Sequence, residues 1–124
     1  MVARDPHRFS NELDDTAVER IAARLESRAQ DDVFARLLDQ YVARLSLPQK
    51  VRVLEVGCGT GAVLRSLARR SDFTGTAIGV DQCRTFVDIA STLAQTEGVG
   101  DRLAFQLGDA HKLDFPSGSF DIVI

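Results

Sequence analysis

The 124-residue sequence has no tryptophan and contains only two cysteines, two histidines and three prolines. Cys58 and Cys83 have no histidines at ligand spacing, so no metal site is indicated, and we expect both thiols to stay reduced. No apolar run is long enough to cross a bilayer, and the first 13 residues are too polar for a signal peptide. These absences predict a cytoplasmic protein without a membrane span.

An excess of charge of one sign is also missing. The chain carries 15 Lys and Arg against 18 Asp and Glu, a net charge of -3. Such a balance gives no general attraction to phosphate backbones, so no nucleic-acid partner is indicated. The length suits one domain, which would bury about two-thirds of its unfolded surface.

Glycine is concentrated where it is most informative, in the segment VRVLEVGCGTG from Val51 to Gly61. The aliphatic run at its start predicts a strand buried on both faces of a parallel sheet. Three alternating glycines then allow positive φ and close approach of a ligand to the backbone. The helix expected over Ala62–Arg70 would turn Arg65 and Arg69 away from the core. A strand, a glycine loop and a helix N-terminus in this order predict a nucleotide site.

Two helices are expected before this segment. Residues 1–14 are polar and predicted to be flexible, and helical spacing begins near Asp15. Asp31 and Asp32 can cap a second helix. Its apolar stripe, which we expect to be mostly core, comprises Val33, Phe34, Leu37, Leu38, Tyr41, Val42 and Leu45. A single bent helix is the alternative, because the spacing nearly continues through Ala29. The first helix could also cover a bound ligand as a lid.

A second acidic position follows the next predicted strand, Thr76–Val80. Asp81 stands about 20 residues beyond the glycine loop, where a carboxylate can accept hydrogen bonds from both hydroxyls of a ribose. The alternative is that Asp81 caps the helix predicted over Thr85–Thr96.

The third strand, expected over Arg102–Leu107, ends at Gly108, Asp109 and Ala110. Asp109 could accept a hydrogen bond from an adenine amino group while the ring lies against Ala110. A simple turn at Asp109 explains the residues equally well. A fourth strand is expected over Phe120–Ile124.

Four motifs in this order resemble those of the class I S-adenosylmethionine-dependent methyltransferases, in particular the small-molecule branch of ubiquinone and menaquinone biosynthesis. They are LEVGCGTG at Leu54–Gly61, GVD at Gly79–Asp81, GDA at Gly108–Ala110 and FDIVI at Phe120–Ile124. The resemblance implies an α/β fold with a Rossmann-like parallel sheet in the order 3-2-1-4. It also implies a methyltransferase domain over residues 15–124, truncated after the fourth strand of a seven-stranded pattern.

The resemblance implies S-adenosylmethionine as cofactor and a small-molecule methyl acceptor. The residues it places at the cofactor are Glu55, Gly57, Cys58, Gly59, Gly61, Asp81, Gln82, Asp109 and Ala110. Gly57, Gly59 and Gly61 would hold the methionine part, Asp81 the ribose, and Asp109 with Ala110 the adenine, with Glu55 near the ammonium. For Cys58 the simpler interpretation is a small side chain that fills a crowded loop.

Two alternatives remain open. Gly57, Gly59 and Ala62 also fit the dinucleotide template G-x-G-x-x-A, although Glu55 would then face a pyrophosphate of its own charge sign. The chain could also be a cofactor-binding fragment without catalysis, since no catalytic residue is identified. In that case the fourth strand, residues 120–124, forms an exposed sheet edge through which we expect self-association.

Overall fold

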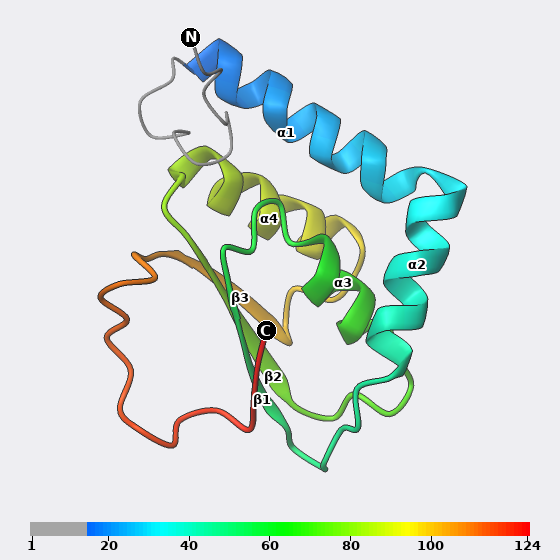
Figure 1. Cartoon of the computed structure of the whole chain (residues 1–124), viewed down its shortest axis with the longest axis vertical. Helices are drawn as coiled ribbons and strands as arrows, with labels where there is room; N and C mark the ends of the chain where they lie inside the picture. The colour runs from blue at the N-terminus through cyan, green and yellow to red at the C-terminus, as the bar shows by residue number, and fades with distance from the viewer. Residues whose placement is uncertain (1–14) are drawn as a thin grey trace, which may run out of the picture.

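A computed structural model describes residues 15–124 and shows a parallel sheet with helices packed on it (Figure 1). The flexible segment predicted for residues 1–14 lies outside the described residues. No helix in the described part of the chain is long and apolar enough to cross a membrane.

The sheet has four strands, β1 (Arg52–Val56), β2 (Thr76–Asp81), β3 (Leu103–Leu107) and β4 (Ile122–Val123). Their order is β3-β2-β1-β4 and every neighbouring pair is parallel. This confirms the predicted α/β class, the Rossmann-like architecture and the order 3-2-1-4. Because the carboxyl ends of parallel strands meet at one edge, the segments that follow β1, β2 and β3 lie beside one another.

Two helices connect these strands, α3 (Ala62–Ala68) and α4 (Arg84–Thr96). Both lie on the same face of the sheet (Figure 1). The main core forms between this face and the helices, and its members are Val42, Val51, Val53, Leu64, Leu67, Ala68, Phe73, Ala77, Ala94, Val99 and Leu103. The core therefore fixes the strand and the helix on either side of the glycine loop.

The N-terminal segment forms two helices, α1 (Asp15–Gln30) and α2 (Asp32–Ala43), and not a single bent one. The break is at Asp31, whose side chain accepts hydrogen bonds from the backbone N–H groups of Val33 and Phe34. This is the N-cap predicted for the second helix. A second core cluster joins α1 to α4 and comprises Val18, Ile21, Ala22, Cys83 and Phe86.

The prediction that the α2 stripe is mostly core is wrong. Val33, Leu37 and Tyr41 are 60%, 58% and 48% exposed, and Val42 is the fully buried member. Apolar spacing marks a face that can be buried, but it does not show how much of that face another element covers. The part of α2 that packs on the main core is narrower than its stripe.

The fourth strand is shorter than the predicted Phe120–Ile124. Only Ile122–Val123 is regular strand, although Asp121 and Ile124 also donate backbone hydrogen bonds to β1. The chain from Gly108 to Asp121 is irregular, so no helix lies between β3 and β4. β4 is last in the strand order and so forms an edge of the sheet, where Val123 is 64% exposed.

Candidate functional site

The glycine loop after β1 has the conformation that its sequence predicts. Gly57, Gly59 and Gly61 have φ of +72°, +56° and +83°, values that side chains with a Cβ rarely adopt. At Gly61 a Cβ would also stand 2.8 Å from the Phe105 ring. The N–H groups of Gly57 and Cys58 both donate to Val80 O, at 2.8 and 3.0 Å. The loop is thereby held against the end of β2.

Asp81, at the end of β2, holds the other side of this loop. One carboxylate oxygen accepts from Gly59 N–H at 3.0 Å and the other accepts from Cys83 N–H at 2.9 Å. The N-cap of α4 is Cys83, so Asp81 is not the cap of that helix. An ionised carboxylate has about four acceptor positions, which leaves room for ligand hydroxyls beside the two backbone donors.

Glu55 lies on β1 directly below the loop and is 6% exposed. Its Oε1 atom is buried and has no hydrogen-bond partner among residues 15–124. Burial, and to a lesser degree the charge of Asp81, raises the pKa of Glu55 to about 8. A buried carboxyl group without a partner is costly in a folded protein, so a ligand that supplies a donor or a cation at this point would be stabilised.

A cavity of about 510 Å³ opens beside these groups. Its lining residues are Leu25, Arg28, Phe34, Glu55, Gly57, Cys58, Gly59, Thr60, Ala62, Val63, Asp81 and Phe86. Five predicted site residues are among them: Glu55, Gly57, Cys58, Gly59 and Asp81. The volume is in the range of sites that bind drug-sized ligands.

The other four predicted residues do not line this cavity. Gly61 is buried behind the loop as the N-cap of α3, and Gln82 is exposed. Asp109 accepts a hydrogen bond from His111 N–H at 2.9 Å, as a turn residue does, and Ala110 beside it is exposed. Asp109 and Ala110 follow β3, so they lie farther along the same sheet edge.

Sequence reasoning left open that the first helix covers a ligand, but it did not identify the residues that the N-terminal helices contribute. Leu25 and Arg28 of α1 and Phe34 of α2 line the cavity, with the Arg28 guanidinium 5.8 Å from the centre of the Phe34 ring. The lid alternative for the first helix agrees with this arrangement, because Leu25 lies against the loop at Gly59. The apolar periodicity of α1 included Leu25, whereas no local pattern pointed to Arg28.

The prediction that Arg65 faces solvent is wrong. Its side chain is only 7% exposed and forms ion pairs at 2.6 Å with Glu26 of α1 and with Glu97 at the end of α4. Glu26 also accepts a 2.6 Å hydrogen bond from the Thr60 hydroxyl in the glycine loop. We call Glu26, Thr60, Arg65 and Glu97 the Arg65 cluster. Two carboxylates from distant segments compensate the burial of this arginine, which helical periodicity alone could not indicate.

The cavity combines apolar walls with Glu55, Asp81 and Arg28. Within residues 15–124 no group of three or more His, Cys, Asp or Glu is placed to hold a metal ion. Two carboxyl groups and one guanidinium suit a ligand with positive charge and one anionic group. The positive φ values of the loop let such a ligand lie close to the backbone.

Comparison with known proteins is consistent with this geometry. The sequence pattern of a family described as methyltransferase domain matches residues 53–124. The 27-O-demethylrifamycin SV methyltransferase of Amycolatopsis mediterranei is 33% identical over 98 residues, which are 79% of this chain and 35% of that protein. The chain spans about a third or less of the length of this and two other curated relatives.

Solved structures share the fold. An S-adenosylmethionine-dependent methyltransferase from Thiobacillus denitrificans, in complex with S-adenosyl-L-homocysteine, is 30% identical with a TM-score of 0.60, covering 69% of this chain and 34% of that one. The cyclase SpnF is 33% identical with a TM-score of 0.65, covering 73% of this chain and 32% of that one. The same fold thus occurs in a protein named for a different reaction, so the reaction must be argued from the site.

Proposed function

The chain belongs to the methyltransferase domain family of class I S-adenosylmethionine-dependent proteins, and from this premise we propose that its cavity binds S-adenosylmethionine for methyl transfer to a small-molecule acceptor. The narrower assignment to the ubiquinone and menaquinone branch stays a prediction. The alternative of a cofactor-binding fragment without turnover is decided by experiment below.

The observation that carries the proposal is the unpartnered Oε1 atom of Glu55. S-adenosylmethionine has a sulfonium, an ammonium and one carboxylate. The cavity has Glu55 for the ammonium and Arg28 for the carboxylate, while Asp81 is left for the ribose. A dinucleotide would instead bring a pyrophosphate toward the Glu55 carboxyl group, which is unfavourable.

We assign the remaining contacts by position. The backbone of Gly57 and Gly59, with Cys58 between them, is proposed to face the methionine part, with Gly61 setting the turn behind it. Asp81 would use its remaining acceptor positions for the ribose hydroxyls. Gln82, Asp109 and Ala110 are proposed to approach the adenine, and their position along the same sheet edge supports this.

The chemistry needs little from the protein beyond positioning. The bound cofactor supplies an activated methyl group, and the chain has to hold it in line with the acceptor and exclude water. The apolar cavity walls from Leu25, Phe34, Val63 and Phe86 suit that task. We assign no catalytic base.

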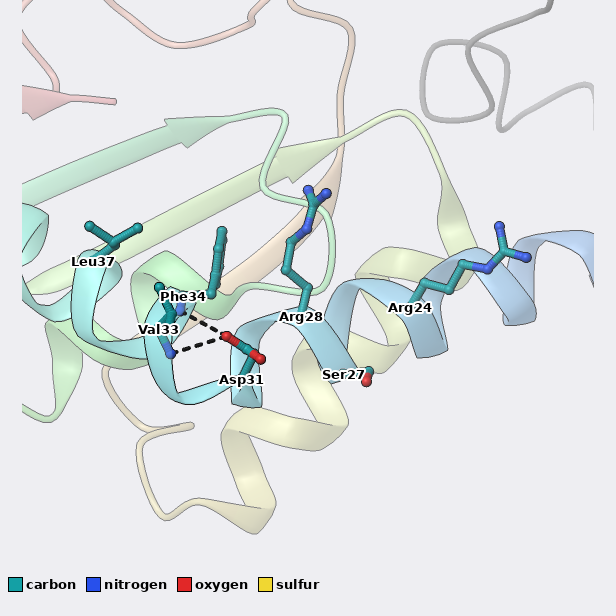
Figure 2. Close-up of a pocket in the computed structure, with 7 residues that line it drawn as sticks. All are labelled: Arg24, Ser27, Arg28, Asp31, Val33, Phe34 and Leu37. Carbon is teal, nitrogen blue, oxygen red and sulfur yellow. Dashed lines mark hydrogen bonds between the residues drawn. The ribbon is translucent and has the colours of Figure 1, made fainter.

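We further propose that the acceptor lies in the neighbouring groove shown in Figure 2. The groove has a volume of about 510 Å³ and is lined by Arg24, Ser27, Arg28, Asp31, Val33, Phe34 and Leu37. Arg28 and Phe34 also line the cofactor cavity. Within residues 15–124 neither Arg24 nor Arg28 has a hydrogen-bond or ion-pair partner. With Arg28 assigned to the cofactor carboxylate, Arg24 is left for the acceptor, so an acceptor with an apolar body and an anionic group would fit these walls.

The absence of tryptophan makes this groove testable, because Leu37→Trp introduces a single tryptophan on its wall. Decanoate is expected to change the fluorescence at lower concentration than decanol does. Equal responses to both, or none to either, would remove the anionic acceptor from the proposal.

Calorimetry and turnover test the central proposal. S-adenosyl-L-homocysteine is expected to bind to the chain, and NAD is not. A radiolabelled methyl transfer assay on a panel of small acceptors then separates an enzyme from a binding fragment. Binding of NAD without binding of S-adenosyl-L-homocysteine would contradict the proposed cofactor.

Self-association through residues 120–124 is a separate proposal, supported by the edge position of β4 and the exposure of Val123. Light scattering coupled to size-exclusion chromatography should show dimers or larger species that Val123→Lys reduces. A monomer at every concentration would contradict it.

A further inference from the structure

The Arg65 cluster connects the N-terminal helix to the glycine loop. Glu26 lies on α1 between residues that line the cavity, Leu25 and Arg28. Its Oε2 atom accepts from the Thr60 hydroxyl at 2.6 Å, and both of its oxygens accept from Arg65 Nη2, at 2.6 and 2.7 Å. One carboxylate therefore contacts both the loop and the helix that follows it.

The surroundings strengthen these contacts. Thr60 is 3% exposed, and the side chains of Arg65 and Glu26 are 7% and 15% exposed. Charged hydrogen bonds shielded from water are stronger than exposed ones, and their loss leaves a buried charge unsatisfied. Besides these polar contacts, α1 is anchored by the small second cluster around Val18 and Phe86, which is separate from the main core.

We propose that Glu26 is a positioning residue for the cofactor cavity, because it fastens α1 onto the glycine loop through Thr60 and Arg65 and so holds Leu25 and Arg28 over the bound ligand. This inference rests on the proposed function for the identity of that ligand. Without Glu26, α1 would leave the loop more often, and the cavity would lose one wall and its guanidinium.

Glu97 supplies a matched control. It pairs with the same arginine at the same 2.6 Å, but it lies at the end of α4, and it also accepts a hydrogen bond from Arg69. Glu26→Ala and Glu97→Ala each remove one carboxylate from Arg65, yet only Glu26→Ala releases the loop. Thr60→Val removes the hydroxyl at nearly unchanged volume, and Thr60→Ser retains it.

The measurements are calorimetric binding of S-adenosyl-L-homocysteine, hydrogen exchange of the amides from Leu25 to Arg28, and urea unfolding. We expect Glu26→Ala to weaken binding about tenfold, which corresponds to about 1.4 kcal/mol, and to speed exchange on α1. Thr60→Val should shift both readouts in the same direction. Glu97→Ala should lower the unfolding midpoint comparably while binding stays within about twofold.

Equal effects of Glu26→Ala and Glu97→Ala on binding and on α1 exchange would overturn the proposal, since the cluster would then be structural only. Unchanged exchange in Thr60→Val would also overturn it. If the wild-type chain binds no S-adenosyl-L-homocysteine, the proposed function fails, whereas the exchange comparison still decides whether Glu26 fastens α1 to the loop.

Discussion

Two glutamates beside the same glycine loop, Glu26 and Glu55, differ in the hydrogen-bond partners of their side chains. Glu26 accepts hydrogen bonds from Arg65 and Thr60. Glu55 is buried more deeply, and one of its oxygens has no hydrogen-bond partner in the part of the chain that the structure describes. Groups of the protein satisfy the Glu26 carboxylate, whereas the Glu55 carboxyl group has an oxygen left for a ligand.

The difference indicates how to separate structural from ligand-binding acids. A buried ion pair is complete in the folded chain, and its charges stabilise each other. A buried carboxyl group without a cation shifts its pKa upward, as Glu55 does, and such shifts gather at functional sites. At this loop, the unsatisfied acid and not the paired one faces the cavity.

The largest expected effect comes from removing Arg65, the cation that pairs with Glu26 and Glu97. Arg65→Met would leave Glu26 and Glu97 without their shared partner at a point that is largely shielded from water. We expect a loss of about 3–5 kcal/mol in the free energy of unfolding, measured by urea denaturation. Arg69→Met is the control. The Arg69 side chain is half exposed where it pairs with Glu97, so its removal should cost less than about 1 kcal/mol. Similar losses for both variants would mean that burial does not distinguish them.

The pH dependence of stability tests the unpaired acid. The pKa of Glu55 rises from 4.5 to about 8 on folding, so the folded chain retains a proton that the unfolded chain loses. The resulting stabilisation is full below the unfolded value and decreases as the pH rises toward the folded value. Between about pH 5 and about pH 7.5 the loss is at most about 3 kcal/mol.

Glu55→Gln cannot ionise and should remove this slope. Urea denaturation of both proteins across that range provides the measurement. Parallel pH profiles for the wild type and Glu55→Gln would show that Glu55 titrates normally in the folded state.

The raised pKa of Glu55 should also make ligand affinity depend on pH. An ammonium group prefers the ionised form of Glu55, so the affinity for S-adenosyl-L-homocysteine is expected to rise with pH up to about 8. Glu55→Gln should bind about tenfold more weakly near pH 8 and lose the pH dependence. Calorimetry in two buffers of different ionisation enthalpy would detect the proton released. A variant that keeps the wild-type profile would separate Glu55 from the ligand.

The smallest effect is expected at an exposed pair. Asp72 accepts two hydrogen bonds from the Arg70 guanidinium, which lowers the pKa of its carboxyl group. Its contribution is present above the unfolded pKa and lost as the pH falls through the folded one. Asp72→Asn should therefore change the acid unfolding profile only slightly, and an effect as large as that of Arg65→Met would break the distinction between exposed and buried pairs.

The features that were predicted from residue patterns are those that depend on residues close in the chain. The aliphatic run and the glycines led to the first strand and to the loop, because turn geometry and strand burial depend on residues close in the chain. The sheet order came from the resemblance of the four motifs to a known family, and the structure confirms it. The hydrogen bonds of Asp81 to the loop were not predicted. They depend on the register between β1 and β2.

Non-local contacts account for what was missed. Arg65 is buried because Glu26 and Glu97 approach it from α1 and from the end of α4, and no helical periodicity contains that information. The exposed half of the α2 stripe is the converse case, since Leu37 follows the apolar pattern but no described element covers it. The roles of Asp109 and Ala110 stay predictions, because a turn explains the observed hydrogen bond equally well.

The thiol of Cys58 in the glycine loop is buried, and this burial lowers its reactivity. Cys58 lines the cavity close to Gly79, and burial, followed by the charges of Glu55 and Asp81, raises the pKa of its thiol. A protonated thiol is a poor nucleophile. A methyl donor is an electrophile, and a thiolate beside it would compete with the acceptor for the methyl group. If the cavity holds a methyl donor, as proposed, burial of Cys58 and its acidic neighbours would keep the thiol protonated and so protect it from methylation.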